Sequence, residues 1–288
     1  MRIQLIVTIL IISAGQVFAG EDVISKQTPY DKADGFNGGL LYDKFWQKGE
    51  VAAQFSNKFG LKIDRINKYS EFYRCKSCHG WDQIGSNGYY IKKSPEKAKQ
   101  PNVSTVNLKK SAISMTPEEI FAKIKNPSKS RPISYDPAEY DPATDTEMGD
   151  RMPNYRYVFT DSEIWDLVKF LKEDTLDHKN YYTLVTEGSY PNGKSWLINI
   201  GKGGDSNIGD RIYAETCSSC HGANGREINI KGLSVGEFTR KKAYELAHKI
   251  KFGHPGSNMF GTNLSVQEMK DIHKALADES KYPAIEER

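Results

Sequence analysis

The chain has 288 residues, enough for two compact domains or one large one. Hydrophobic residues make up 38% of it, and no run of about eighteen apolar residues occurs, which excludes a protein with several membrane-spanning helices. Forty basic against 37 acidic side chains leave a net charge of +3. This balance argues against a nucleic-acid partner, because nucleic-acid-binding proteins carry a basic stripe.

Residues 1–19 have the pattern of a secretory signal peptide. Arg2 precedes an apolar run that extends from Leu5 to Ala14. Small residues then mark a cleavage site before Gly20. The alternative is an uncleaved membrane anchor, but the run is short for a membrane span. We therefore expect a periplasmic or otherwise exported protein with no stable membrane insertion after cleavage.

Residues 20–60 are expected to form an N-terminal extension. Within them, residues 38–46 read GGLLYDKFW, an apolar and aromatic cluster. This cluster predicts an additional helix that packs on the domain that follows.

The four cysteines form two C-x-x-C-H patterns, at 75–79 and 217–221. This is the attachment signature of c-type haem. Two thiols can bond to the two vinyl groups at one porphyrin edge, and the histidine that follows can then reach the iron. We therefore expect two covalently attached haem c groups. Their expected binding residues are Cys75, Cys78, His79, Cys217, Cys220 and His221.

Three other uses of the cysteines compete with haem attachment. A zinc ribbon also uses two C-x-x-C pairs, but these pairs lie far apart, and such a site requires no histidine after each pair. A thioredoxin-like C-x-x-C needs neither the histidine nor a second copy. Two short disulfides are an ordinary outcome in an exported protein. The repeated histidine and the absence of a spare cysteine favour covalent haem over all three.

The chain has the pattern of a diverged duplication around the two motifs. Each motif is followed by a glycine and by two helices with apolar faces. Capping boxes predict helix starts at Thr116–Glu119 and Thr160–Glu163 in the first copy, and at Ser265–Glu268 in the second. The middle helix of the second copy is expected around 243–250 and can end at Gly253.

The segment before the second motif, GDRIY at 209–213, resembles the short N-terminal helix of class I cytochromes c. In the first copy Asn67 and Glu71 hold the corresponding positions and depart from that pattern. The sequence CKSCHGWD at 75–82, with the cluster at 38–46, resembles a subgroup of bacterial multidomain c-type cytochromes.

This resemblance implies a mainly α fold with two tandem class I cytochrome c-like helical domains, at 61–178 and 205–288. The linker at 179–204 contains two β-prone segments around Pro191–Lys194, so a small β-hairpin is expected there.

A methionine precedes each final helix. Met152-Pro153 resembles the distal-ligand loop of class I cytochromes c, which implies that Met152 is the sixth iron ligand, with Met148 as the rival. Met259 has a similar place in the second copy, and His254 could ligate instead. A thioether ligand raises the reduction potential, whereas a second histidine gives a lower one.

Other groups have weaker assignments. A carbonyl within Pro101–Leu108 could orient His79, as the resemblance suggests. The acidic loop at 126–150 lacks the spacing of an EF-hand, so a solvated loop is favoured over calcium binding. The remaining histidines are expected on the surface or in helices. These histidines are His178, His248 and His273. A modest basic cluster could steer an acidic partner; it consists of Lys92, Lys93, Lys97 and Lys99.

The pattern predicts an exported dihaem cytochrome c that transfers single electrons between redox protein partners, without catalytic side chains. Three alternatives remain. Dihaem thiosulfate dehydrogenases share the two-domain plan but use a cysteine iron ligand, and no cysteine is left for that role. Dihaem peroxidases need an iron with an open position. An electron-transfer subunit of a larger enzyme complex is the third alternative.

Overall fold

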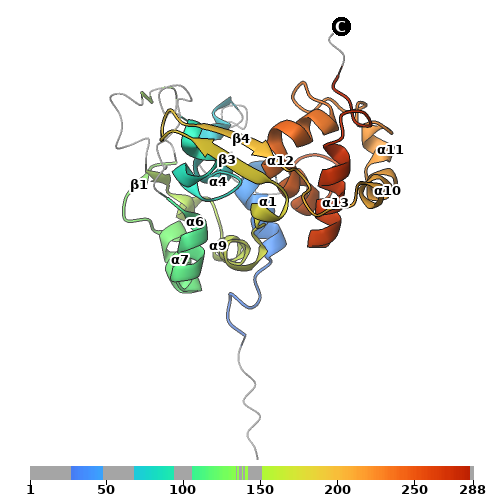
Figure 1. Cartoon of the computed structure of the whole chain (residues 1–288). Coiled ribbons are helices and arrows are strands. Elements are labelled where there is room, and N and C mark those ends of the chain that lie inside the picture. The colour runs from blue at the N-terminus through green and yellow to red at the C-terminus, as the bar shows by residue number, and fades with distance from the viewer. Residues whose placement is uncertain are drawn as a thin grey trace, which may run out of the picture.

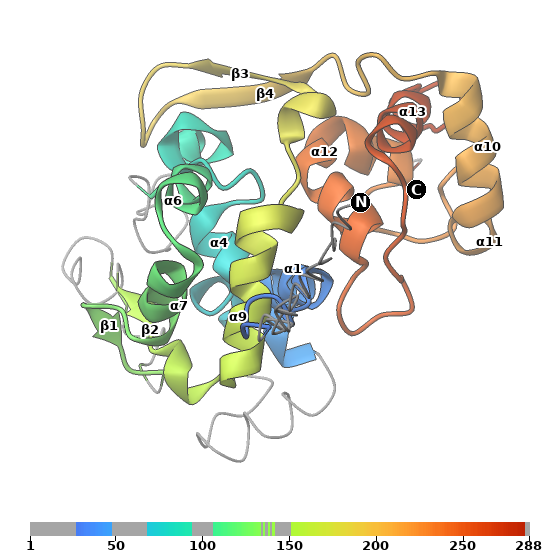
Figure 2. The same ribbon diagram turned by 90° about the horizontal axis from the view of Figure 1, so that it is seen from below.

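The computed structural model of the chain describes residues 27–47, 68–93, 106–133, 135, 138, 140–141 and 151–285. The fold is mainly helical (Figures 1 and 2). Its buried apolar side chains form two clusters. None of the helices in these ranges is long and apolar enough to cross a membrane. The expected signal peptide lies outside the described residues.

The first core is built from helices and one short pair of parallel strands. Its elements are α1 (Gly35–Lys44), α4 (Cys75–His79), α6 (Leu108–Ser114), α7 (Pro117–Lys125), β1 (Ser130–Arg131), β2 (Met152–Pro153) and α9 (Asp161–Lys169). A π-helical turn, Phe170–Asp174, continues α9. Single 3-10 turns lie at Phe45–Gln47, Ser70–Phe72, Gly85–Asn87, Tyr89–Lys92, Tyr155–Tyr157 and His178–Asn180.

The second core follows a two-stranded hairpin. Its elements are β3 (Thr183–Glu187), β4 (Lys194–Ile198), α10 (Ser206–Thr216), α11 (Ser218–His221), α12 (Val235–Phe252) and α13 (Val266–Leu276). The antiparallel hairpin pairs Thr183 with Ile198 and Glu187 with Lys194, which confirms the expected hairpin. In Figure 2 it runs from the side of α6 towards α12.

The predicted helix caps are confirmed. The three capping boxes are Thr116–Glu119, Thr160–Glu163 and Ser265–Glu268. In each of them the Ser or Thr hydroxyl accepts from the backbone N–H of the glutamate. The glutamate carboxylate in turn accepts from the backbone N–H of the Ser or Thr. The second middle helix is longer than predicted, because Ser234 and Glu237 form a further capping box. It bends at Lys242 and stops at Gly253, as expected.

Helix α1 is packed in the first core in the same way as α10 is packed in the second. A Cβ atom at Gly38 would lie 2.0 Å from the carbonyl oxygen of Asp166 on α9. A Cβ atom at Gly209 would likewise lie 2.0 Å from the carbonyl oxygen of Asp271 on α13. Both glycines therefore allow two helix backbones to touch.

The ends of the two helices repeat the same contacts. Asp34 and Asp205 cap α1 and α10, and their backbone N–H groups donate to the carboxylates of Asp166 and Asp271 at 2.7 and 2.8 Å. Within the described residues it is therefore α1 that makes the contacts of α10. The departure of Asn67 and Glu71 from the 209–213 pattern stays a prediction, because Asn67 lies outside the described ranges. Residues 45–74 separate α1 from Cys75, whereas α10 runs directly into Cys217, so spacing from the cysteines could not locate α1.

The two cores share side chains at their boundary. Phe252 from α12 belongs to the first cluster, and Trp81, which follows the first haem motif, belongs to the second. His248 on α12 lies between them, with its ring 4.6 Å from that of Trp81 and 4.7 Å from that of Phe252.

His248 and His273 lie in helices α12 and α13, as expected, and His178 begins a 3-10 turn. All three are buried. Each has a ring nitrogen against a backbone carbonyl oxygen: those of Tyr244, Gly39 and Met269 respectively. Burial lowers the pKa of all three, so they are neutral packing residues.

Candidate haem sites

A cavity of about 630 Å³ lies in the first core, and the first C-x-x-C-H motif forms part of its wall. Cys75, Cys78 and His79 line the cavity from α4. Met152 lines the same cavity from β2, although it is far from the motif in the sequence. The structure therefore brings together the three expected attachment residues and the expected sixth ligand.

Both ends of α4 are held by buried tyrosines. The hydroxyl of Tyr155 donates to the carbonyl oxygen of Tyr73 at 2.7 Å, just before the motif. The hydroxyl of Tyr42 donates to the carbonyl oxygen of Gly80 at 2.6 Å, just after it. Gly80 has a φ of +76°, which glycine adopts without strain. These bonds fix the direction in which α4 presents its side chains.

Met152 is held in place by the short strand pair. Ser130 in β1 pairs with Met152 in β2, and the backbone N–H of Asn154 donates to the carbonyl oxygen of Arg131 at 3.0 Å. The fully buried side chain of Arg131 donates from Nε to the carbonyl oxygen of Arg151 at 3.1 Å. Arg131 thus ties the chain on both sides of Met152, at Arg151 and at Asn154, to the core.

The chemistry of the cavity fits a covalently bound haem. Burial lowers the pKa of His79 to about 4, so its imidazole is neutral and can offer a lone pair to a metal. Burial also raises the pKa of Cys75 to about 12 and that of Cys78 to about 11, so both are thiols. None of the four cysteines forms a disulfide.

The second motif repeats this arrangement on α10 and α11. The hydroxyl of Tyr213 donates to the carbonyl oxygen of Gly222 at 2.7 Å, which matches the bond from Tyr42 to Gly80. Burial lowers the pKa of His221. Cys217 packs against the second core, whereas Cys220 is exposed.

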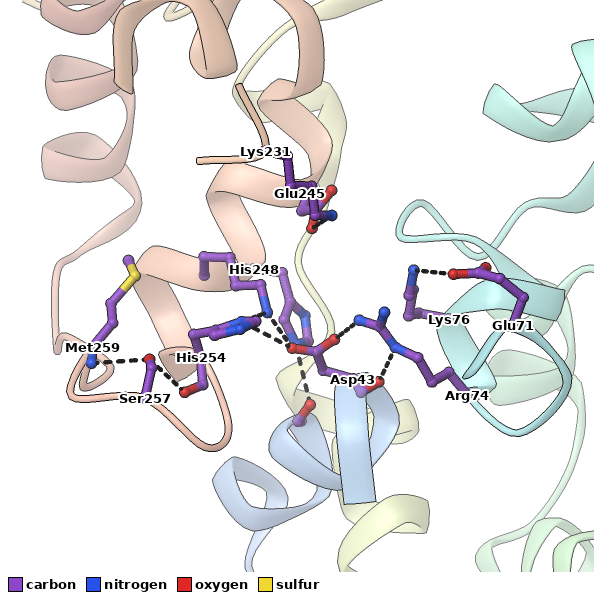
Figure 3. A network of polar contacts seen from close by, with 12 residues as sticks. Asp43, Glu71, Arg74, Lys76, Lys231, Glu245, His248, His254, Ser257 and Met259 are labelled. Atoms are coloured by element: carbon purple, nitrogen blue, oxygen red, sulfur yellow. Dashed lines mark hydrogen bonds and ion pairs between the residues drawn. The ribbon is translucent and has the colours of Figure 1, made fainter. Parts of the chain in front are cut away.

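Met259 and His254, the two candidates for the second sixth ligand, lie on one closed loop. The backbone N–H of His254 donates to the carbonyl oxygen of Met259 at 2.9 Å, and Gly253 pairs with Phe260. The ring of His254 points towards Asp43 on α1 (Figure 3) and its Nδ1 lies 4.0 Å from the carboxylate. The Met259 side chain does not point towards Asp43 (Figure 3).

No hydrogen-bond acceptor for either proximal histidine is found among the described residues. The Nδ1 atoms of His79 and His221 are buried there without a hydrogen-bond partner. Most of the segment Pro101–Leu108, which could supply one for His79, lies outside the described ranges, and so does Met148.

The weaker assignments are only partly covered by the structure. Lys92 and Lys93 lie over the rings of Tyr89 and Tyr90 at 4.2 and 5.0 Å, and the other two lysines of the basic cluster fall outside the described ranges. Most of the acidic loop at 126–150 also falls outside them. In the part of the chain that is described, no group of three His, Cys, Asp or Glu side chains could hold a metal ion.

Two family models match the chain. Residues 67–174 match the model of cytochrome c, and residues 204–274 match that of cytochrome c oxidase, cbb3-type, subunit III. Both matched segments are thus similar to c-type cytochrome domains. Such domains bind covalently attached haem c and serve haem-based electron transfer. Comparison with curated proteins and with solved structures gave no significant match.

Sequence reasoning missed the tyrosines that hold α4 and the role of α1. A signal for both was present, because Gly38 and Tyr42 have the same spacing as Gly209 and Tyr213. No pattern in the sequence indicates Arg131, because a single buried arginine has no periodicity.

Proposed function

We propose that the chain is an exported dihaem cytochrome c that passes single electrons between redox protein partners. One observation carries this proposal. Cys75, Cys78, His79 and Met152 line one cavity, and the second motif repeats the tyrosine bond and the buried imidazole Nδ1 atom of the first. The proposed ligand pairs are His79 with Met152 and His221 with Met259.

We also propose that the first domain begins near Asp34, so that it includes α1. The N-terminal extension then shortens to residues 20–33, and the remaining boundaries stay at 178, 204 and 288. The shared packing of α1 and α10 supports this division. The signal peptide at 1–19 remains part of the proposal, because a c-type cytochrome domain is usually an exported one.

A haem held in each site would supply one-electron chemistry at its iron. The contribution of the chain is to hold that group rigidly. The cysteines anchor it, the tyrosine bonds orient α4 and α11, and the apolar walls keep water away. A methionine ligand favours ferrous iron and raises the potential. No side chain has to move a proton, which fits an electron carrier.

One alternative gains support from the comparisons. The second domain matches the subunit III model of an oxidase complex. This favours an electron-transfer subunit of a larger enzyme over a thiosulfate dehydrogenase-like or peroxidase-like enzyme. Copurification of the chain with a stable partner complex from its own cells would support that alternative.

The test is the haem content of the mature protein, purified after export. We expect two haems per chain, by pyridine haemochrome absorbance and by intact mass, and an N-terminus at Gly20. Matched double variants, Cys75→Ser with Cys78→Ser and Cys217→Ser with Cys220→Ser, should each retain one haem.

A spectrum with and without carbon monoxide then separates carrier from enzyme. Two low-spin haems that do not bind carbon monoxide support electron transfer. A single haem in the wild-type protein would contradict the dihaem assignment. A haem that binds carbon monoxide would indicate an iron open to substrate.

A further inference from the structure

A largely buried group of titratable side chains joins the two domains, and the proposed electron transfer does not use it. This interdomain charge cluster consists of Asp43, Arg74, Lys249 and His254 (Figure 3). Asp43 is on α1, and its side chain is 0% exposed. Arg74 directly precedes Cys75, Lys249 lies in the last turn of α12, and His254 is on the Met259 loop.

Asp43 is the centre of the cluster. One carboxylate oxygen forms an ion pair with Arg74 and the other with Lys249. Arg74 also donates from Nε to the backbone carbonyl oxygen of Asp43 at 2.7 Å. Burial alone would raise the pKa of Asp43, but Lys249 and Arg74 outweigh burial and hold it well below its ordinary value. The carboxylate is therefore ionised, and its removal would leave two buried cations without a counter-charge.

A chain of contacts leads from Asp43 to Met259. The ammonium group of Lys249 contacts both the carboxylate of Asp43 and Nδ1 of the His254 ring. The backbone N–H of His254 then bonds to the carbonyl oxygen of Met259 at 2.9 Å. Gly253, which precedes His254, pairs with Phe260 and closes the loop. The chain passes so close there that a Cβ atom on Gly253 would lie 2.6 Å from the carbonyl oxygen of Met259.

The cluster also contacts the first haem motif. The ammonium group of Lys249 lies 5.5 Å from the ring centroid of Trp81, two residues beyond His79. Lys76, inside the motif, lies 5.5 Å from the same ring. The neighbouring His248 donates to the carbonyl oxygen of Gly39 on α1 at 3.1 Å. The Met259 loop is therefore anchored on the first domain and not only on its own.

We propose that Asp43 is a positioning residue for the second iron site, which it reaches from the first domain. Through Lys249 it holds the ring of His254 on the side of Asp43 and so leaves Met259 as the side chain of the loop that can ligate. This proposal rests on the ligand pair His221 and Met259 proposed above.

The test is Asp43→Asn in the mature dihaem protein, because asparagine keeps the shape and removes the charge. Two readouts are the near-infrared charge-transfer band of methionine-ligated ferric haem and the two reduction potentials. We expect one of the two methionine contributions to the band to be lost. We also expect the potential of the second haem to fall, because a nitrogen ligand or a weaker methionine bond favours ferric iron.

A purely electrostatic role of Asp43 predicts a different result. Removal of a buried negative charge disfavours the more positive ferric state, so both potentials would rise and the band would be kept. The potential of the second haem therefore falls if Asp43 positions the ligand and rises if Asp43 acts only through its charge. The band kept in full, with both potentials raised, would overturn the proposal.

Asp271→Asn is the matched control. Asp271 is also a buried carboxylate, but it accepts from the backbone N–H of Asp205 and lies outside the cluster. It should keep both methionine contributions. If Asp43→Asn fails to fold, the double variant Asp43→Asn with Lys249→Gln decides, since it removes a cation together with the carboxylate. It should lose the same contribution to the band.

His254→Gln separates failure of this proposal from failure of the ligand assignment. In the wild-type background this variant should keep both methionine contributions and bind no carbon monoxide. A second haem that becomes open in His254→Gln would show that His254 is the ligand, and the proposed ligand pair would fail. Both contributions kept in His254→Gln and in Asp43→Asn would refute the role of Asp43 alone.

Discussion

Replacement of Gly38 by alanine tests whether α1 is the counterpart of α10. At an exposed helix position this change stabilises a protein by about 1 kcal/mol. At Gly38 the new methyl group would lie 2.0 Å from the carbonyl oxygen of Asp166, whereas ordinary contact begins at 3.4 Å. The obstacle is backbone, so α1 and α9 must separate.

The loss of stability in Gly38→Ala is the cost of overpacking minus the gain in helix propensity. Overpacking of a core costs about 1–3 kcal/mol, and a collision with backbone belongs at the upper end. With the gain in helix propensity subtracted, the free energy of unfolding should fall by about 2 kcal/mol. Gly209→Ala meets the carbonyl oxygen of Asp271 at the same 2.0 Å, so we expect the same loss in the second domain.

Hydrogen exchange followed by mass spectrometry can assign each loss to a domain. Gly38→Ala should speed exchange in α1 and α9 by about 30-fold, which corresponds to about 2 kcal/mol. Gly209→Ala should do the same in α10 and α13. The control Glu215→Ala, on the exposed face of α10, should change stability by less than about 0.5 kcal/mol. Unchanged exchange in α1 and α9 for Gly38→Ala would refute the equivalence of the two helices.

Two further predictions concern the first iron site and the pH dependence of stability. Met152→Ala should retain two haems per chain, lose one methionine contribution to the near-infrared band and let one haem bind carbon monoxide; an unchanged band would point to Met148. His273 is fully buried, and burial lowers its pKa from 6.5 to about 4, so the folded state excludes its proton. Protonation of His273 in the unfolded state therefore lowers the free energy of unfolding as the pH falls from 6.5 towards 4, by about 3 kcal/mol in total. Above pH 6.5 this loss is absent. Urea midpoints between these pH values should depend less on pH in His273→Gln than in the wild type, and an equal dependence would contradict the assignment.

Local features were readable from the sequence because each depends on neighbouring residues. The capping boxes at Thr116, Thr160 and Ser265 use bonds within one turn, and the structure has all three. The hairpin around Pro191–Lys194 was also predicted correctly, since its strands are close in the chain. The haem motifs belong to this class, because two thiols and one imidazole fall within five consecutive residues.

Features that join distant segments were not readable in this way. The sequence predicts residues 38–46 as an additional helix and not as the counterpart of α10. The reason is that residues 45–74 separate α1 from Cys75, whereas α10 ends directly before Cys217. His248 and His273 lie in helices, which is one of the two expected placements, but only the packing shows that they are buried. The position of Met152 at the cavity wall was expected from a family resemblance, but the strand pair that holds it there was not.

The sequence by itself determined the two C-x-x-C-H motifs, the helix ends and the helical character of the chain, because short-range bonds and spacing fix these. Only the tertiary structure decided that Asp43 meets Arg74 and Lys249, and that the Met259 loop is anchored on the other domain. A buried carboxylate is stable only where cations come to it, and these cations come from segments that are far apart in the chain. Their meeting depends on the packing of α1 against α12, which no local pattern records.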